Sequence, residues 1–187
     1  MIKRKMVAAC LTAALLTFGA ASLAGCGPSN EEVIRQAVTE ELESVKALDP
    51  TLLDQMTSNA GLEQLEAYGI DSREFVSSYL AGFDYRVDDV TVDGETAQAT
   101  IVLTCKSFSA FAAGFTEAVT ALSTDESIPN MSEEEVNQLI GQAVMDTLAS
   151  IQPTETAPLT LGYELKDSVW TPTAEAEQAI TNAMFGN

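Results

Sequence analysis

Apolar residues recur at helical spacing over much of the chain, and this periodicity predicts several helices. The first stripe extends from Ile34 to Leu48 and ends before Pro50. Shorter patterns predict helices over residues 51–56, 61–68 and 71–81. Sequences typical of capping boxes stand at three helix starts: Ser29-x-x-Glu32, Asp71-x-x-Glu74 and Ser132-x-x-Glu135. The first part of the folded chain is therefore predicted to be helical.

The period then changes to two, which indicates β-strands. Apolar and polar residues alternate over 83–92, and the parity shifts near Asp88-Asp89, where we expect a β-bulge. Asp93-Gly94 indicates a tight hairpin, and the returning strand extends over residues 96–106. A second hairpin is predicted over residues 159–170.

Two helices are predicted between these hairpins, over residues 108–122 and 132–151. The first carries Phe108, Phe111 and Phe115 with Glu117 as its one charge. We expect this aromatic stripe to be buried in the core rather than to form a ligand cage.

The last helix begins after Thr173, whose hydroxyl can cap it. The order of elements predicts an α+β domain. We expect N-terminal helices packed on a curved antiparallel sheet of about four strands (two hairpins), with a helical pair inserted between the hairpins.

The start of the chain is similar to a bacterial lipoprotein signal. Lys3-Arg4-Lys5 precedes an uncharged apolar run, as in export signals. Leu23-Ala24-Gly25-Cys26 resembles the lipobox, in which the thiol takes a diacylglyceryl group and the chain is cut just before it. The resemblance implies lipidation of Cys26, cleavage-site recognition through Leu23, Ala24 and Gly25, and attachment to the outer face of the cytoplasmic membrane.

Without cleavage, residues 6–24 would be just long enough to span a bilayer and would anchor the chain in the same orientation. The small residues before Cys26 favour processing. We therefore expect residues 1–25 to be a signal peptide, 26–28 a lipidated linker, and 29–187 a single domain.

The chain is strongly acidic, with 9 basic and 28 acidic residues and a formal net charge of −19. Three basic residues would leave with the signal and all 28 acidic residues would stay, so the mature chain of 162 residues would carry −22. Nucleic-acid phosphates and anionic headgroups repel such a chain, so we expect no nucleic-acid partner. Solubility outside the cell is the simplest interpretation of this charge.

The sequence contains no histidine, which excludes Ser-His-Asp and Cys-His nucleophile systems and histidine metal sites. Cys105 would be the remaining thiol after processing, because Cys10 leaves with the signal and Cys26 takes the lipid. Its place on the apolar side of a strand predicts a buried, unreactive side chain. We expect no cofactor.

Carboxylates are the remaining candidates for chemistry. Asp84, Asp88, Asp89 and Asp93 form the densest group and are candidates for binding a ligand or a cation, because oxygen-only sites suit calcium. Their spacing matches no calcium loop, however, and aspartates at strand edges and turns are a simpler interpretation. We therefore predict no established metal or catalytic residue.

The order of elements resembles the cystatin-like α+β superfamily, which includes nuclear transport factor two. The resemblance rests on the N-terminal helices and on Phe83-Asp84-Tyr85, Asp93-Gly94, Thr96-Ala97 and a final hairpin with Trp170. It implies a curved sheet around a helix, with a cone between them that sometimes holds a small ligand. The inserted segment 108–151 departs from the simplest pattern of that superfamily.

We expect a non-catalytic, lipid-anchored extracytoplasmic protein that binds a protein partner or a small ligand. The alternative is a small isomerase- or dehydratase-type enzyme, in which a carboxylate and the hydroxyl of Tyr79, Tyr85 or Tyr163 act in the cone of the sheet. A buried carboxylate near one of these hydroxyls would favour the enzyme, and a cone filled with apolar side chains would contradict it. A transporter's solute receptor fits poorly, because one domain offers no two-lobed cleft.

Overall fold

The helices begin where the sequence supplies side-chain caps. In the computed structural model, which describes residues 28–59 and 62–186, Ser29 caps α2 (Asn30–Lys46). The Ser29 backbone N–H donates to the Glu32 carboxylate at 2.9 Å, and the Ser29 hydroxyl accepts from the Glu32 N–H, so the predicted capping box is confirmed. Leu23, Ala24, Gly25 and Cys26 lie outside the described residues.

The second full capping box lies at the start of α6 (Glu133–Ser150), where Ser132 and Glu135 make the same reciprocal pair. At α4 (Ser72–Leu80) one half of the predicted box is present, because the Asp71 carboxylate accepts from the Glu74 N–H. The remaining helices are α3 (Pro50–Asn59), the 3₁₀ helices η1 (Leu62–Tyr68) and η2 (Ile128–Asn130), α5 (Phe108–Ser123) and α7 (Ala174–Phe185).

The strands form one antiparallel sheet in the order β1-β2-β4-β5, and the short β3 also pairs with β2. The strands are β1 (Asp84–Asp93), β2 (Thr96–Cys105), β3 (Thr154–Glu155), β4 (Leu159–Lys166) and β5 (Val169–Pro172). Both predicted hairpins are confirmed, and the register shifts between Val87 and Asp89, where the bulge was expected. The protein is therefore α+β, as the sequence predicts.

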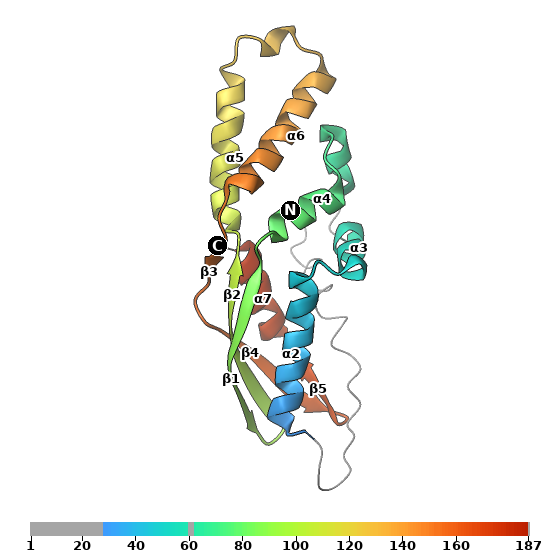
Figure 1. Ribbon diagram of the computed structural model, residues 1–187, viewed down its shortest axis with the longest axis vertical. Coiled ribbons are helices and arrows are strands. Elements are labelled where there is room, and N and C mark those ends of the chain that lie inside the picture. The colour runs from blue at the N-terminus through green and yellow to red at the C-terminus, as the bar shows by residue number, and fades with distance from the viewer. Residues whose placement is uncertain (1–27, 60–61, 187) are drawn as a thin grey trace.

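The hydrophobic core lies between one face of the sheet and the helices α2 and α7 (Figure 1). The stripe of α2 buries Ile34, Val38, Leu42 and Val45, and β2 contributes Ile101, Leu103 and the predicted buried thiol of Cys105. Burying each large aliphatic side chain contributes roughly 1.5–3 kcal/mol, so this face is the main source of stability. These core side chains of α2 and β2 lie between helix and sheet, where the resemblance implies a cone.

The helices α5 and α6 form a hairpin that projects beyond the end of the sheet (Figure 1). They do not cover the face that α2 and α7 occupy. The hairpin packs instead on η1 and α4 through α6. Gly141 on α6 is part of this contact, because a Cβ built there would lie 2.0 Å from the Tyr68 carbonyl oxygen.

Among residues 28–59 and 62–186, no helix combines the length and the hydropathy that a membrane-spanning segment requires.

Candidate functional site

Glu41 is an acidic residue on the apolar stripe of α2. It lies two turns after Ile34 and one turn after Val38, so all three side chains share one face of the helix. Ile34 and Val38 are each 1% exposed, and Glu41 beside them is half-buried. A carboxyl group in such a position is costly for folding, which makes it a candidate for function.

The surroundings of Glu41 change its titration. Burial, and secondly repulsion from the Glu177 carboxylate, raise the pKa of Glu41 to about 8. Glu177 belongs to α7 and is itself half-buried, so this repulsion acts between two different helices. Near neutral pH, Glu41 is therefore mostly protonated and can act as a hydrogen-bond donor.

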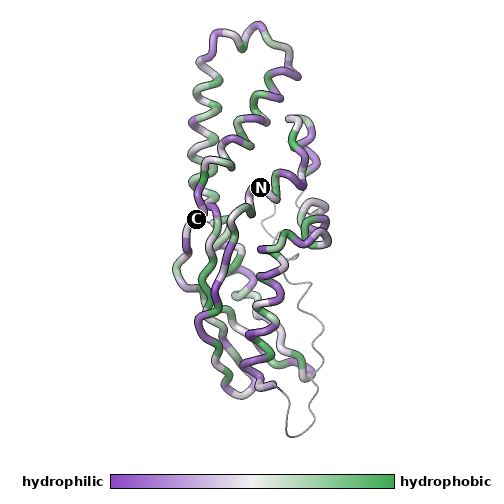
Figure 2. Tube along the Cα trace, in the orientation of Figure 1, coloured by the Kyte–Doolittle hydropathy of each residue, from purple (hydrophilic) through white to green (hydrophobic). Residues whose placement is uncertain are grey.

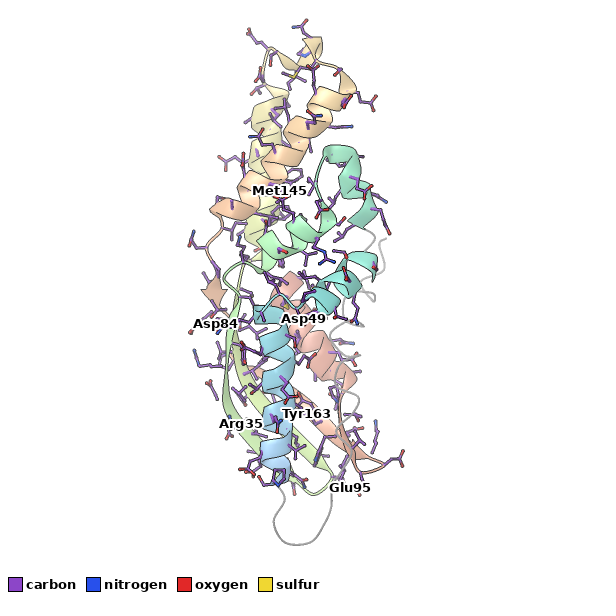
Figure 3. The ribbon with its side chains drawn as sticks, turned by 45° about the vertical axis from the view of Figure 1, so that its right-hand side comes forward. Arg35, Asp49, Asp84, Glu95, Met145 and Tyr163 are labelled. Atoms are coloured by element: carbon purple, nitrogen blue, oxygen red, sulfur yellow. The ribbon has the colours of Figure 1, made fainter. Side chains whose placement is uncertain are left out.

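Tyr163 of β4 lies beside α2 (Figure 3), and the charge of Glu41 on that helix acts on its phenol. It is 4% exposed, and burial together with the charge of Glu41 raises the pKa of its phenol. No hydrogen bond joins its hydroxyl to another residue in the described part of the chain.

Trp170 adds a donor next to Tyr163. In the β4–β5 hairpin Tyr163 pairs with Pro172 and Leu165 pairs with Trp170, so Tyr163 and Trp170 are diagonal neighbours on one face. The indole Nε1 of Trp170 is buried, and no described residue accepts its hydrogen. Such an unsatisfied donor is rare in a folded protein.

These four residues, Glu41, Tyr163, Trp170 and Glu177, are called the Glu41 cluster below. The cluster combines a carboxyl group that is protonated near neutral pH with an acidic partner, a phenol and an indole N–H. A carboxyl group with the pKa of Glu41 can exchange a proton near pH 8.

The other two candidate tyrosines have partners for their hydroxyls. Tyr79 donates to the backbone oxygen of Met184. Tyr85 donates to the Thr39 backbone oxygen at 3.2 Å and to the Glu43 carboxylate at 3.0 Å. Of the three candidate tyrosines, Tyr163 is therefore the one whose hydroxyl has no hydrogen-bond partner among the described residues.

The four aspartates singled out in the sequence are exposed and spread along β1. Asp84 and Asp93 stand at opposite ends of this ten-residue strand, roughly 30 Å apart at the usual rise per residue. Asp84 pairs with Lys46 at 2.8 Å and Asp88 with Arg86 at 2.9 Å. Asp89 follows the register shift, and Asp93 flanks the turn. The four residues do not come together in one site.

Residues 28–59 and 62–186 contain no group of three or more acidic, cysteine or histidine side chains arranged to hold a metal ion.

A second feature is the apolar surface of α5, formed by Phe108, Ala112, Phe115 and Val119 at helical spacing. We call it the α5 face. The expectation that the aromatic stripe of α5 is buried in the core is met in part. Phe111 is half-buried and packs against the core, whereas Phe108 is exposed. Phe108 is 42% exposed and Val119 is 36% exposed. Figure 2 shows hydrophobic residues recurring along this helix although it lies outside the sheet half of the molecule.

Sequence reasoning missed Glu41 and Glu177 as site residues. One signal was present, since Glu41 is an acidic residue at a position where the helix pattern requires an apolar one. Nothing in the sequence places Glu177 next to it, because that contact depends on how α2 and α7 pack on the sheet.

No protein-family model matches the chain, and no curated protein matches it in sequence. Among solved structures, the crystal structure of the candidate lipoprotein YcdA from Bacillus subtilis aligns with a TM-score of 0.47 and 14% sequence identity. The alignment covers 96% of this chain and 55% of YcdA, so this chain spans little more than half the length of that protein. A likeness of this size assigns neither a family nor a function.

Proposed function

We propose that this chain is a lipid-anchored extracytoplasmic protein whose α5–α6 hairpin binds a partner protein. The observation that carries the proposal is α5, a 16-residue helix that has one charged side chain and no buried residue. Exposed apolar area is unfavourable by about 25 cal/mol per Å², so burial against a partner would be favourable. The α5 face is the surface we assign to that contact.

The position of the hairpin suits an anchored protein. In Figure 1 the first turn of α2 and the tip of the α5–α6 hairpin lie at opposite ends of the molecule. A lipid on Cys26 would hold the chain only a few residues before Ser29, where α2 is capped. The hairpin would then point away from the membrane, toward partners outside the cell or in the envelope.

Acidic residues at the tip of the hairpin indicate which charges the surface of the expected partner should carry. Asp125 and Glu126 lie between the two helices, and Glu133 and Glu134 begin α6, and all four are exposed. The partner should therefore offer an apolar groove with basic side chains at its rim. Binding of this kind weakens at high salt, whereas the apolar part of the contact does not.

A second candidate function is acid–base catalysis at the Glu41 cluster. A carboxyl group with a pKa near 8 beside a tyrosine hydroxyl is suited to moving a proton at neutral pH. Against it, the space between the sheet and α2 is largely filled by apolar side chains. A binding function is the one we propose.

The anchor is tested by growing cells with a labelled lipid precursor. Wild-type protein should carry the label and sediment with membranes, and Cys26→Ala should lose both properties. Cys10→Ala is the matched control, because Cys10 lies in the proposed signal and should not affect the label. Equal labelling of Cys26→Ala and the wild type would overturn the anchor.

The hairpin is tested with a double variant, Phe108→Lys and Val119→Lys. Both side chains are exposed, so the variant should fold with a nearly unchanged melting temperature. It should lose the partner that co-purifies with wild-type protein from solubilised membranes. The control Gln142→Lys adds charge to an exposed position of α6 and should keep the partner. Retention of that partner by the double variant would contradict the proposal.

A further inference from the structure

The apolar residues of the α5 face follow the heptad spacing of a coiled-coil helix. Phe108, Ala112, Phe115 and Val119 are separated by four, three and four residues, and Leu122 continues the series. Alternating steps of three and four place these side chains in one seam along the helix. Phe108, Ala112 and Val119 are exposed, while Phe115 and Leu122 are half-buried. The seam therefore has the form of one half of a helix–helix contact.

The other sides of α5 are in contact with neighbouring helices or carry its charge. Phe111 makes an edge-to-face contact with Phe75 of α4, with ring centroids 6.4 Å apart. A Cβ at Gly114 would lie 3.0 Å from a methyl group of Thr147, so α6 packs closely on that side. Glu117, the one charged residue of the helix, lies about half a turn from the centre of the seam. The seam itself is thus free of charge.

The hairpin that carries this seam contains only negative charges. Residues 107–151 include seven acidic side chains and neither lysine nor arginine. Four of these side chains lie at the tip or in the first turn of α6, where they are exposed: Asp125, Glu126, Glu133 and Glu134. A second copy of this chain would bring the same charges to the contact, so repulsion disfavours it as the partner. A cationic partner is attracted instead.

We propose that the partner of the α5 face is a cationic amphipathic α-helix. This inference rests on the proposed function, since it concerns the same surface, and it names the class of the partner. The apolar groove expected in the partner is then the row of holes between the apolar side chains of that helix, with Lys or Arg beside the row. The basic side chains nearest the end of the hairpin reach its acidic tip.

The length of the seam sets the size of the partner helix. From Phe108 to Leu122 the seam extends over about 21 Å at the usual rise of a helix, so the partner needs about four turns. Ser109, Thr116 and Ser123 border the seam on one side and carry no charge. Attraction between charges therefore acts mainly at the tip, and apolar packing supplies the contact along the seam.

The test uses the full chain in nanodiscs of zwitterionic phosphatidylcholine and a synthetic peptide of three heptads, about 21 residues, as the probe. The peptide has Leu at the a and d positions, Lys at the flanking e and g positions, and Ala and Gln elsewhere. A fluorescent label reports binding through its anisotropy, and binding to empty nanodiscs is subtracted. We expect saturable binding that weakens at least about threefold between about 50 mM and 500 mM sodium chloride.

Two control peptides separate charge from shape. A peptide with Glu in place of Lys keeps the apolar row and should bind at least about tenfold more weakly, because its charges repel those of the hairpin. A scrambled peptide keeps the composition of the Lys peptide but loses the heptad spacing, and it should also bind at least about tenfold more weakly.

A seam variant connects binding to the α5 face. Phe108→Ser with Val119→Ser removes apolar area and leaves the charge of the hairpin unchanged. Both side chains are exposed, so the variant should keep the melting temperature of the wild type. It should bind the Lys peptide at least about tenfold more weakly, because two apolar side chains of the contact are lost.

A tip variant connects the preference for Lys to the acidic residues. Glu126→Gln with Glu134→Gln should reduce the preference for the Lys peptide over the Glu peptide at least about threefold. Glu31→Gln with Glu175→Gln is the matched control, because it removes the same charge from the first turns of α2 and α7 in the sheet half of the molecule. The control should keep the preference.

The inference is overturned if the Lys peptide does not bind, if the Glu or the scrambled peptide binds as tightly, or if the seam variant binds like the wild type. It is also overturned if a photoreactive amino acid at Val119 yields adducts of two copies of this chain in cells, because a second copy then occupies the face. If the Lys peptide does not bind but Phe108→Lys with Val119→Lys loses the co-purifying partner, the class of the partner is wrong and the proposed function stands.

Discussion

Lys106 Nζ donates a hydrogen bond to the backbone oxygen of Leu148 at 2.6 Å. It also donates to the backbone oxygen of Ser78 at 2.8 Å. These oxygens belong to the last turns of α6 and α4, where carbonyl groups have no partner within the helix and carry partial negative charge. Lys106, which is 5% exposed and follows β2, therefore connects the helical half of the molecule to the sheet.

Replacing Lys106 by Met should lower the free energy of unfolding by about 2–4 kcal/mol, because a buried and a partly buried carbonyl group lose their donor. Urea denaturation followed by circular dichroism measures the change. Lys166→Met is the control, since the Lys166–Glu164 pair is exposed and such pairs contribute little. Equal stability of the two variants would contradict the role of Lys106.

The stability of the protein should fall as the pH rises from about 5 to 8. The pKa of Glu41 is about 8 in the folded state and near 4.5 when the group is free in water. Between these two pH values the unfolded state has lost the proton of Glu41, whereas the folded state keeps it. Rising pH therefore favours the unfolded state, and the free energy of unfolding falls. The loss should be on the order of a few kcal/mol and should level off above pH 8.

Glu41→Gln should remove this pH dependence and make the variant more stable than the wild type at pH 8, as measured by urea denaturation between pH 5 and 9. Glu43→Gln should keep the wild-type profile. The lowered pKa values of Asp84, Asp125 and Glu135 affect stability at a lower pH, so they do not produce this slope. A flat profile for the wild type would count against the buried position of Glu41.

Gly141→Ala should loosen the contact between α6 and η1. A Cβ at this position would lie 2.0 Å from the Tyr68 backbone oxygen, so the two elements must separate. We expect a loss of about 1–3 kcal/mol in the free energy of unfolding. Gly114→Ala on α5 meets only a Thr147 methyl group at 3.0 Å and should cost less, because a side chain can adjust. A larger loss for Gly114→Ala than for Gly141→Ala would contradict the close packing of α6 on η1.

One phenylalanine of the core and one of the α5 face should differ in how much they contribute to stability. Phe83 is 5% exposed, and Phe83→Ala should cost about 3–5 kcal/mol. Phe108 is 42% exposed, and Phe108→Ala should change the free energy of unfolding by less than about 1 kcal/mol. Similar losses for both variants, measured by chemical denaturation, would place Phe108 in the core and remove the basis for a binding surface.

The sequence predicted the elements that depend on local chemistry. The Ser29–Glu32 and Ser132–Glu135 capping boxes and the bulge between Val87 and Asp89 all follow from residues near one another in the chain. Periodicity then identified the apolar side of each element, and α2 and β2 bury the predicted residues.

The sequence did not predict which surfaces stay uncovered. The stripe of α5 has the periodicity of a core helix, but periodicity does not say whether another element lies against it. In the same way, the proximity of Glu41 and Glu177 depends on the packing of α2 and α7, which no local pattern encodes. Both candidate sites arise from tertiary arrangement.

Photo-crosslinking in intact cells tests the central claim most directly. A photoreactive amino acid placed at Val119 or at Phe108 should give the same discrete adduct, and one at the exposed Gln178 of α7 should not. The adduct should decrease in the Cys26→Ala background, where the protein is no longer held at the membrane. An adduct of equal yield from Gln178, or none from either α5 position, would contradict a partner-binding hairpin.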